Sequence, residues 1–87
     1  MKESDVPEGV RLYPNPAYGE VHIELASFEN WGKSRWMLCD MQGRVLDGGS
    51  VEGMLTTVSM AAYPRGVYVI RLLSEEGRSC SLKVIKY

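Results

Sequence analysis

Residues of the types that catalyse reactions are few in this 87-residue sequence, and their spacing forms no recognisable catalytic set. The single histidine, His22, stands two residues before Glu24 in a segment that alternates apolar and polar residues, so both side chains are expected to point outward. Ser27 and Ser59 lack the glycine-flanked context that exposes a nucleophilic serine on a sharp turn. We therefore interpret His22 as a surface residue and predict that the chain is not an enzyme.

Three acidic residues near expected turns, Asp40, Asp47 and Glu52, are the best candidates for binding a cation. They lack the dense carboxylate spacing of a calcium-binding loop. An aspartate at a corner commonly accepts hydrogen bonds from its own backbone, and this role accounts for Asp40 and Asp47. One histidine and two cysteines do not provide the ligand spacing of a structural zinc site. We predict no metal and no cofactor.

The two cysteines, Cys39 and Cys80, are a possible disulfide pair, and a disulfide would suit an extracytoplasmic protein. The alternation of the two segments that contain them places their side chains on opposite faces. We therefore expect two free thiols and a fold that is stabilised by apolar burial.

Aromatic residues that are exposed together can form a sugar-binding platform, and this possibility has to be weighed for Trp31 and Trp36. Trp36 is in phase with Leu38 on an alternating segment, so we predict that it is buried as an anchor of the core. Trp31 lies beside Gly32 in an expected loop. We predict that Trp31 is at least partly exposed, and we leave it open as a contact surface.

The formal net charge of −1 argues against a nucleic-acid-binding protein, because phosphate contacts require a basic surface. The charge is unevenly distributed: residues 1–59 contain nine acidic and five basic residues, whereas residues 60–87 contain two acidic and five basic residues. The basic end is either a solvated strand face or a surface that a partner recognises. No pattern indicates a small-molecule substrate.

A chain of this length forms one domain, and its 45% hydrophobic content permits an apolar core without a metal or a disulfide. No apolar run approaches the ~20 residues of a membrane-spanning helix, and no signal peptide is visible. Met1 is followed by polar residues up to Gly9, so we interpret residues 1–9 as the remnant of a linker from a larger parent protein. Residues 10–87 are expected to form the domain itself.

Glycine and proline interrupt the sequence every eight to twelve residues, and the runs between them alternate apolar with polar residues. This pattern is typical of many short strands. The expected strands are residues 10–13, 20–26, 34–40, 44–47, 55–59, 67–73 and 78–86. Such strands fit an all-β, seven-stranded antiparallel immunoglobulin-like Greek-key sandwich, with a small barrel as the alternative fold.

Short motifs in a fixed order provide the only signal that concerns function. They are Leu12-Tyr13-Pro14-Asn15-Pro16 leading into Glu20-Val21-His22-Ile23, then Asp40-Met41-Gln42-Gly43-Arg44-Val45, then Pro64-Arg65-Gly66-Val67-Tyr68-Val69-Ile70-Arg71-Leu72, and finally Lys83-Val84-Ile85-Lys86. Over nearly the whole chain, this set resembles the type A C-terminal sorting domain of the type IX (Por) secretion system. Two departures are the final Tyr87 and the presence of Trp36 at a strand position where aliphatic residues are more usual.

The resemblance implies a non-catalytic secretion signal on a protein of the Bacteroidetes type. It implies recognition in the periplasm and at the outer membrane by the translocon, the shuttle and a sortase-like peptidase of the secretion system, and the peptidase usually removes the domain. The cargo then reaches the cell surface or is secreted, and it is often attached to anionic lipopolysaccharide. The alternative function is an immunoglobulin-like accessory module of a secreted protein, such as a carbohydrate-binding domain or an adhesive spacer.

Partner recognition is expected at the two C-terminal motifs. The candidate residues are Gly66, Tyr68, Lys83, Val84, Ile85 and Lys86. A closing strand at a sheet edge offers unpaired backbone groups for strand addition. Lys83 and Lys86, expected on the outward face, would either add charge selectivity or protect the edge from aggregation. We also expect Gly66 to adopt a backbone conformation that a side chain would disfavour.

Overall fold

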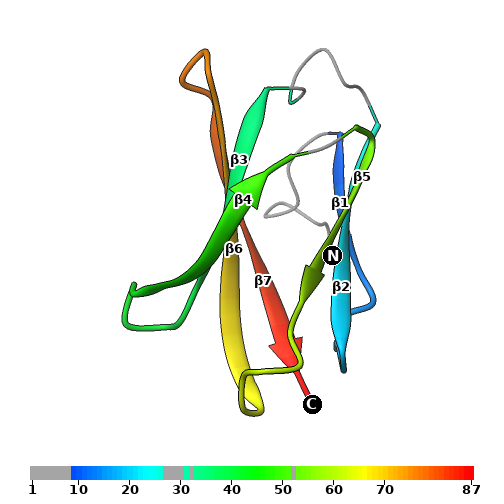
Figure 1. The fold of residues 1–87 in the computed structure, drawn as a ribbon, viewed down its shortest axis with the longest axis vertical. Coiled ribbons are helices and arrows are strands. Elements are labelled where there is room, and N and C mark those ends of the chain that lie inside the picture. Colours follow the sequence, from blue (N-terminus) through cyan, green and yellow to red (C-terminus); the bar gives the residue numbers. More distant parts are fainter. Residues whose placement is uncertain (1–8, 27–30, 32, 52) are drawn as a thin grey trace, which may run out of the picture.

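Antiparallel strands form between the glycine and proline breaks of the sequence (Figure 1). A computed structural model of the chain describes residues 9–26, 31, 33–51 and 53–87. Within these residues the strands are β1 (Val10–Tyr13), β2 (Glu20–Leu25), β3 (Ser34–Cys39), β4 (Val45–Ser50), β5 (Leu55–Ser59), β6 (Gly66–Ser74) and β7 (Ser79–Lys86). The part of the chain that the structure describes contains no helix long and apolar enough to cross a membrane.

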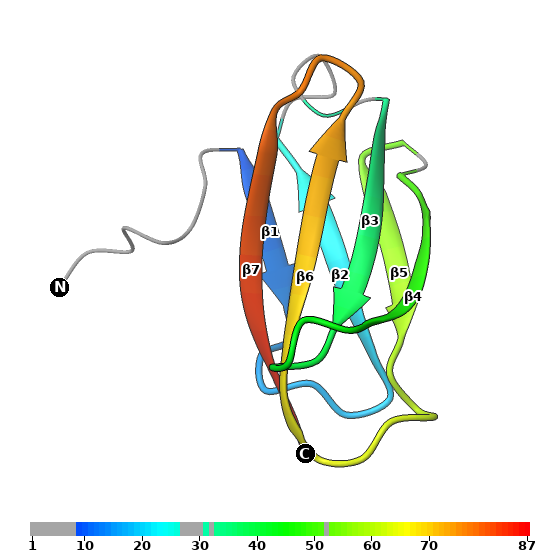
Figure 2. The same ribbon diagram turned by 90° about the vertical axis from the view of Figure 1, so that its left-hand side faces the viewer.

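The strands form two layers. One sheet has the order β1-β2-β5 and the other has the order β4-β3-β6-β7, and all pairs within both sheets are antiparallel. Figure 1 shows the two layers edge-on, and Figure 2 shows the four-stranded sheet in front of the three-stranded sheet. The expected all-β architecture with seven strands is confirmed, and the two separately paired sheets form a sandwich rather than a closed barrel.

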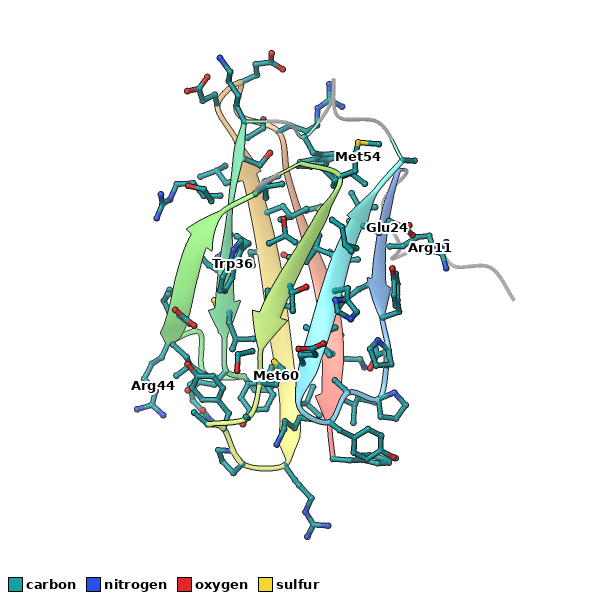
Figure 3. The ribbon with its side chains drawn as sticks, turned by 45° about the vertical axis from the view of Figure 1, so that its right-hand side comes forward. Arg11, Glu24, Trp36, Arg44, Met54 and Met60 are labelled. Carbon is teal, nitrogen blue, oxygen red and sulfur yellow. The ribbon has the colours of Figure 1, made fainter. Side chains whose placement is uncertain are left out.

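Alternation along each strand builds the core between the layers. In β2, Val21, Ile23 and Leu25 are buried, while the intervening side chains are more exposed. Strands β6 and β7 repeat this pattern, so each sheet contributes one apolar face. Trp36 is buried between the sheets, as predicted (Figure 3).

The position of Trp31 corrects the sequence-based prediction. Trp31 is only 4% exposed and belongs to the same hydrophobic cluster as Trp36. The guanidinium carbon of Arg78 lies 5.9 Å from the centre of the indole ring. The local sequence pattern does not reveal whether an aromatic side chain outside the strands packs into the core.

Strand β4 is longer than expected and contains the two glycines that the sequence pattern assigned to a break. A Cβ atom on Gly49 would lie 3.0 Å from Nε1 of Trp36, closer than side chains normally approach. The glycine therefore lets the edge strand pass directly over the indole. A register shift between Leu38 and Cys39 in the neighbouring strand accommodates the pairing.

The cysteines lie on opposite faces of the four-stranded sheet. Cys80 packs against the core cluster, whereas Cys39 is buried on the outer side. Both are free thiols, as predicted. Burial raises the pKa of the Cys80 thiol, because the charged thiolate is less well solvated there.

Candidate functional site

All six predicted recognition residues lie at one end of the β6–β7 hairpin. The register of the two strands places Gly66 opposite Lys86 and Tyr68 opposite Val84, with Ile85 opposite Val67. The Pro-Arg-Gly-Val-Tyr motif and the closing Lys-Val-Ile-Lys motif are therefore cross-strand neighbours. The structure brings the candidates together, although their side chains face different surroundings.

Strand β7 forms one edge of the four-stranded sheet, but half of this edge is already occupied. The proline loop, defined here as residues 14–17, runs alongside the C-terminal half of β7. The Asn15 amide donates from Nδ2 to the Lys83 carbonyl at 3.0 Å, and its Oδ1 accepts the Ile85 N–H at 2.9 Å. Ala17 donates its N–H to the Ile85 carbonyl at 2.7 Å and accepts the Tyr87 N–H at 2.9 Å. The first and last motifs of the chain are thus hydrogen-bonded to each other.

The alternation of backbone groups divides the β7 edge into a closed and an open half. Ile85 directs both its N–H and its carbonyl to the proline loop, so Lys83, Ser81 and Ser79 direct theirs to the same side of the strand. Among the described residues, no hydrogen bond reaches the Lys83 N–H or the outward backbone groups of Ser79 and Ser81. The open half of the edge therefore extends from Ser79 to the N–H of Lys83.

The four closing side chains differ in exposure. Lys83 is exposed, Ile85 is half-buried and Val84 is completely buried in the core. Lys86 does not point freely outward as predicted, because its Nζ donates to the Tyr63 carbonyl at 3.0 Å. Of the two lysines, only Lys83 offers an unengaged ammonium group within the described part of the structure.

Tyr68 explains the spacing of the Pro-Arg-Gly-Val-Tyr motif. Its ring is buried, and its hydroxyl donates to the Pro64 carbonyl four residues earlier, at 2.5 Å. The Tyr63 ring lies 6.2 Å from the Tyr68 ring, measured between their centres. The crossover that leads into β6 is therefore held by the tyrosine that follows it.

Gly66 only partly meets the expectation of an unusual backbone conformation. Its φ is +159°, at the border between the positive-φ region and extended backbone. A Cβ atom there would meet nothing closer than Cε1 of Tyr68 at 3.9 Å, which is an ordinary contact distance. The surrounding space therefore gives no steric reason for glycine.

The Asp-Met-Gln-Gly-Arg motif forms the β3–β4 turn. Asp40 Oδ1 accepts the N–H groups of Gln42 at 2.9 Å and Arg44 at 3.0 Å, and Oδ2 accepts from Arg44 Nε at 2.8 Å. These hydrogen bonds, chiefly that from the Arg44 N–H, hold the pKa of Asp40 below its usual value. Gly43 has φ +88°, as the turn requires. The predicted turn role of Asp40 is confirmed.

The arrangement of these motifs agrees with a comparison against known families. Residues 11–87 match the family described as "Secretion system C-terminal sorting domain". The chain belongs to this family. The match confirms the resemblance that the ordered motifs indicated, and it covers the same segments that meet at the end of the β6–β7 hairpin.

A solved structure supports the fold of the sorting domain. The chain is similar to PorZ, described as an essential bacterial surface component of the type-IX secretion system of Porphyromonas gingivalis, with 22% sequence identity and a TM-score of 0.67. The alignment covers 98% of this chain but 12% of the PorZ chain. At this identity the likeness shows the fold alone. No curated protein matches the sequence.

The part of the sorting domain that sequence reasoning missed is the contact made by the proline loop. The sequence assigned no contact to either residue: Asn15 was only part of the first motif, and Ala17 only followed that motif. An asparagine between two prolines is the available signal, because the flanking prolines cannot donate to a regular ladder and the side-chain amide of the asparagine can both donate and accept hydrogen bonds.

His22 and the acidic residues show no convergent chemistry. His22 Nδ1 lies 3.0 Å from Thr57 Oγ1, and its Nε2 lies 3.6 Å from a Glu20 carboxylate oxygen. Glu24 instead forms an ion pair with Arg11 at 3.1 Å (Figure 3). No group of three potential metal ligands occurs within the described residues, and Glu52 lies outside them.

Proposed function

We propose that this sorting domain is the C-terminal signal that directs an attached cargo protein through the type IX secretion system. The family match over residues 11–87 carries this proposal. The domain itself performs no catalysis. Its partners are the outer-membrane translocon, the shuttle and a sortase-like peptidase that removes it, and the cargo passes through the periplasm to the cell surface or the medium. There the cargo is attached to anionic lipopolysaccharide.

The domain proper comprises residues 10–87, and residues 1–9 belong to a linker from the cargo. We also infer that the connectivity is an immunoglobulin-like Greek key. Two features support this inference: β2 pairs with β5 in one sheet while β3, β4, β6 and β7 form the other, and Tyr68 bonds the backbone four residues upstream. Such a tyrosine corner is characteristic of these sandwiches.

Recognition by the secretion machinery takes place at the end of β7. We assign direct contact to the side chains of Lys83, which is exposed, and of Ile85, which is half-buried like Gly66 and Lys86. The other four candidates hold this surface in place. Gly66 and Tyr68 form the turn into β6, Val84 packs in the core, and Lys86 bonds to the Tyr63 carbonyl. The alternative function, a carbohydrate-binding accessory module, loses the main candidate for its contact surface, because the buried Trp31 cannot stack on a sugar.

Export of a reporter tests the sorting function. A reporter fused to the N-terminal end of this chain should leave a bacterium that has the type IX apparatus. The same reporter without residues 10–87 should remain inside the cell. Equal export of both fusions would overturn the proposed function.

A single substitution tests whether the machinery contacts the Lys83 side chain. Lys83→Ser alters an exposed side chain and should change the free energy of unfolding by no more than about 0.5 kcal/mol, yet it should reduce export. Lys33→Ser is the matched control, because Lys33 is also an exposed lysine and precedes Ser34, which pairs with Ser74 at the opposite end of the β6–β7 hairpin. Normal export of folded Lys83→Ser would exclude recognition through this ammonium group.

A further inference from the structure

The outer face of the four-stranded sheet has an unusual charge composition. Strands β3, β6 and β7 contain no aspartate or glutamate, but they contain two arginines and two lysines. Burial alternation places Arg35, Arg71 and Lys83 on the outer face, opposite the core residues of the same strands. Within the described residues none of these three cations forms an ion pair. These three strands therefore present unpaired positive charge on the outer face.

Apolar side chains separate these cations on the outer face. The register places Val69 between Cys39 and Lys83, and Arg71 between Met37 and Ser81. Leu73 is 46% exposed and Met41 is 60% exposed, which is high for side chains of their size. The surface is thus both basic and apolar, rather than the uniformly polar face that an exposed antiparallel sheet usually presents to water.

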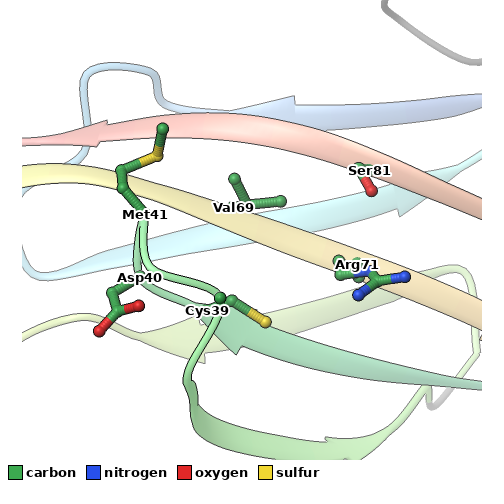
Figure 4. A pocket seen from close by; sticks show the side chains of 7 residues that line it. Cys39, Asp40, Met41, Val69, Arg71 and Ser81 are labelled. Atoms are coloured by element: carbon green, nitrogen blue, oxygen red, sulfur yellow. The ribbon is translucent and has the colours of Figure 1, made fainter.

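A shallow groove lies on this face. It has a volume of about 250 Å³ and is lined by Cys39, Asp40, Met41, Gly43, Val69, Arg71 and Ser81. Figure 4 shows Val69 between Met41 at one end and Arg71 with Ser81 at the other. The carboxylate at its rim, Asp40, is already neutralised by Arg44. The groove therefore offers a side chain an apolar floor with a guanidinium at its end.

The groove borders the open half of the β7 edge. Ser79 and Ser81 are the outward residues there, and both side chains are short and exposed. In a sheet, the residue of a new strand directly opposite Ser81 has its side chain on the same face as Ser81. A long side chain at that position can extend past the serine toward Arg71 and Lys83.

We propose that the open edge of β7, from Ser79 to Lys83, binds an extended acidic segment of a partner polypeptide as a fifth strand of the sheet. This inference deepens the proposed function and rests on it. Unpaired backbone groups give the added strand its hydrogen bonds. The carboxylates of the segment lie against Arg71 and Lys83, and its apolar atoms cover the groove. Charge complementarity selects an acidic segment over a neutral or basic one.

Synthetic peptides test this inference on the whole 87-residue chain. The probes are three capped seven-residue peptides that alternate Thr with Glu, Gln or Lys. In amide chemical-shift titrations at low salt, the Glu peptide should shift the signals of Ser79, Ser81 and Lys83 and should bind at least tenfold more tightly than the Gln peptide. The Lys peptide should not bind. Raising the salt to 1 M should weaken binding of the Glu peptide, because charge interactions are then screened.

Two variants locate the surface. Arg71→Glu should weaken binding of the Glu peptide at least tenfold, whereas Arg65→Glu, with the same change of charge, should leave it unchanged. Ser81→Pro should also lose binding, since it removes an outward N–H and leaves the ladder to β6 intact. Circular dichroism checks that each variant folds, and Arg71→Glu provides the test if the proline variant does not.

Several outcomes would overturn the inference: equal affinity for the Glu and Gln peptides, no binding of either peptide, shifts confined to β4 or β5, or equal losses for Arg71→Glu and Arg65→Glu. Reporter export separates this inference from the sorting function. If the wild-type fusion and the Arg71→Glu fusion are exported equally, the docking inference is wrong and the sorting function stands. If the wild-type fusion is not exported, the sorting function itself is wrong.

Discussion

Asn15 and Ile85 are 70 residues apart in the sequence, and the side chain of Asn15 takes the place of a neighbouring strand for Ile85. Its amide accepts the Ile85 N–H and donates to the Lys83 carbonyl, as a backbone on the next strand would. Ala17 extends the same edge with two backbone hydrogen bonds. One short loop therefore closes the C-terminal half of an otherwise unpaired edge.

Replacing Asn15 by alanine should destabilise the domain. The variant loses two hydrogen bonds that close the edge, and each contributes about 0.5–1.5 kcal/mol. We expect the free energy of unfolding, measured by urea denaturation, to fall by about 1–2 kcal/mol. Gln42→Ala is the control, because its exposed side chain makes no hydrogen bond within the described structure. Equal midpoints for Asn15→Ala and the wild type would show that the proline loop adds nothing to stability.

Removing the hydroxyl of Tyr68 should also destabilise the domain, although the ring remains in the core. Tyr68→Phe loses the bond to the Pro64 carbonyl, so thermal and urea unfolding should report a loss of about 1 kcal/mol. Tyr18→Phe is the matched control, since Tyr18 is 63% exposed and its hydroxyl has no hydrogen-bond partner among the described residues. A loss of the same size in both variants would mean that the bond to Pro64 is not the cause.

Truncation of either tryptophan should severely lower the stability of the domain. Trp31→Ala and Trp36→Ala each remove a large buried side chain, which typically costs about 3–5 kcal/mol. That loss is comparable with the whole stability of a small domain, so circular dichroism should show loss of the β spectrum or a much lower melting temperature. Tyr18→Ala should melt close to the wild type. Normal melting of Trp31→Ala would place Trp31 outside the core.

The turn carboxylate of Asp40 should make stability depend on pH. Its pKa is lower in the folded state than in the unfolded chain, so the ionised group stabilises the fold above the unfolded pKa of about 4. This contribution is lost as the pH falls through the lower, folded pKa. The difference in unfolding free energy between wild type and Asp40→Asn should therefore be constant from pH 7 to 5 and shrink below about pH 4.

The control for this pH series is Glu76→Gln, which also removes one carboxylate but lies at the exposed tip of the β6–β7 hairpin. The difference in unfolding free energy between wild type and Glu76→Gln should not shrink in the same way below about pH 4. A wild-type-to-Asp40→Asn difference that stays constant down to pH 2 would show that the hydrogen bonds of the turn do not favour the charged form of Asp40.

Much of the fold was predictable because burial in a sandwich has a period of two residues. The alternation of Val21, Ile23 and Leu25 fixed the phase of β2, and similar runs located β6 and β7 to within a residue or so. Strand β4 was predicted too short, because glycines normally interrupt strands. Here Gly49 continues the strand and makes room for the Trp36 ring, a contact between strands that the sequence of either strand does not show.

The candidate site was less predictable because its side chains depend on loops that are distant in sequence. The two-residue alternation of β7 correctly predicted that Val84 is buried. It did not predict that the Lys86 ammonium donates a hydrogen bond to the Tyr63 carbonyl on the crossover, because no local pattern indicates this bond. Trp31 was predicted to be partly exposed for the same reason: whether a side chain outside the strands packs into the core depends on tertiary contacts. The motif that contains Asn15 was recognised, whereas its hydrogen bonds to β7 required the structure.

The closure of the β7 edge by Asn15 also bears on the order of folding. Contacts that close long stretches of chain cost more conformational entropy than local ones, and they tend to form late. The β6–β7 hairpin is local, so it can form before the proline loop docks. Until then the backbone of β7 is open along its full length. The species at greatest risk of intermolecular strand pairing during refolding is therefore an almost complete sandwich whose proline loop has not yet docked.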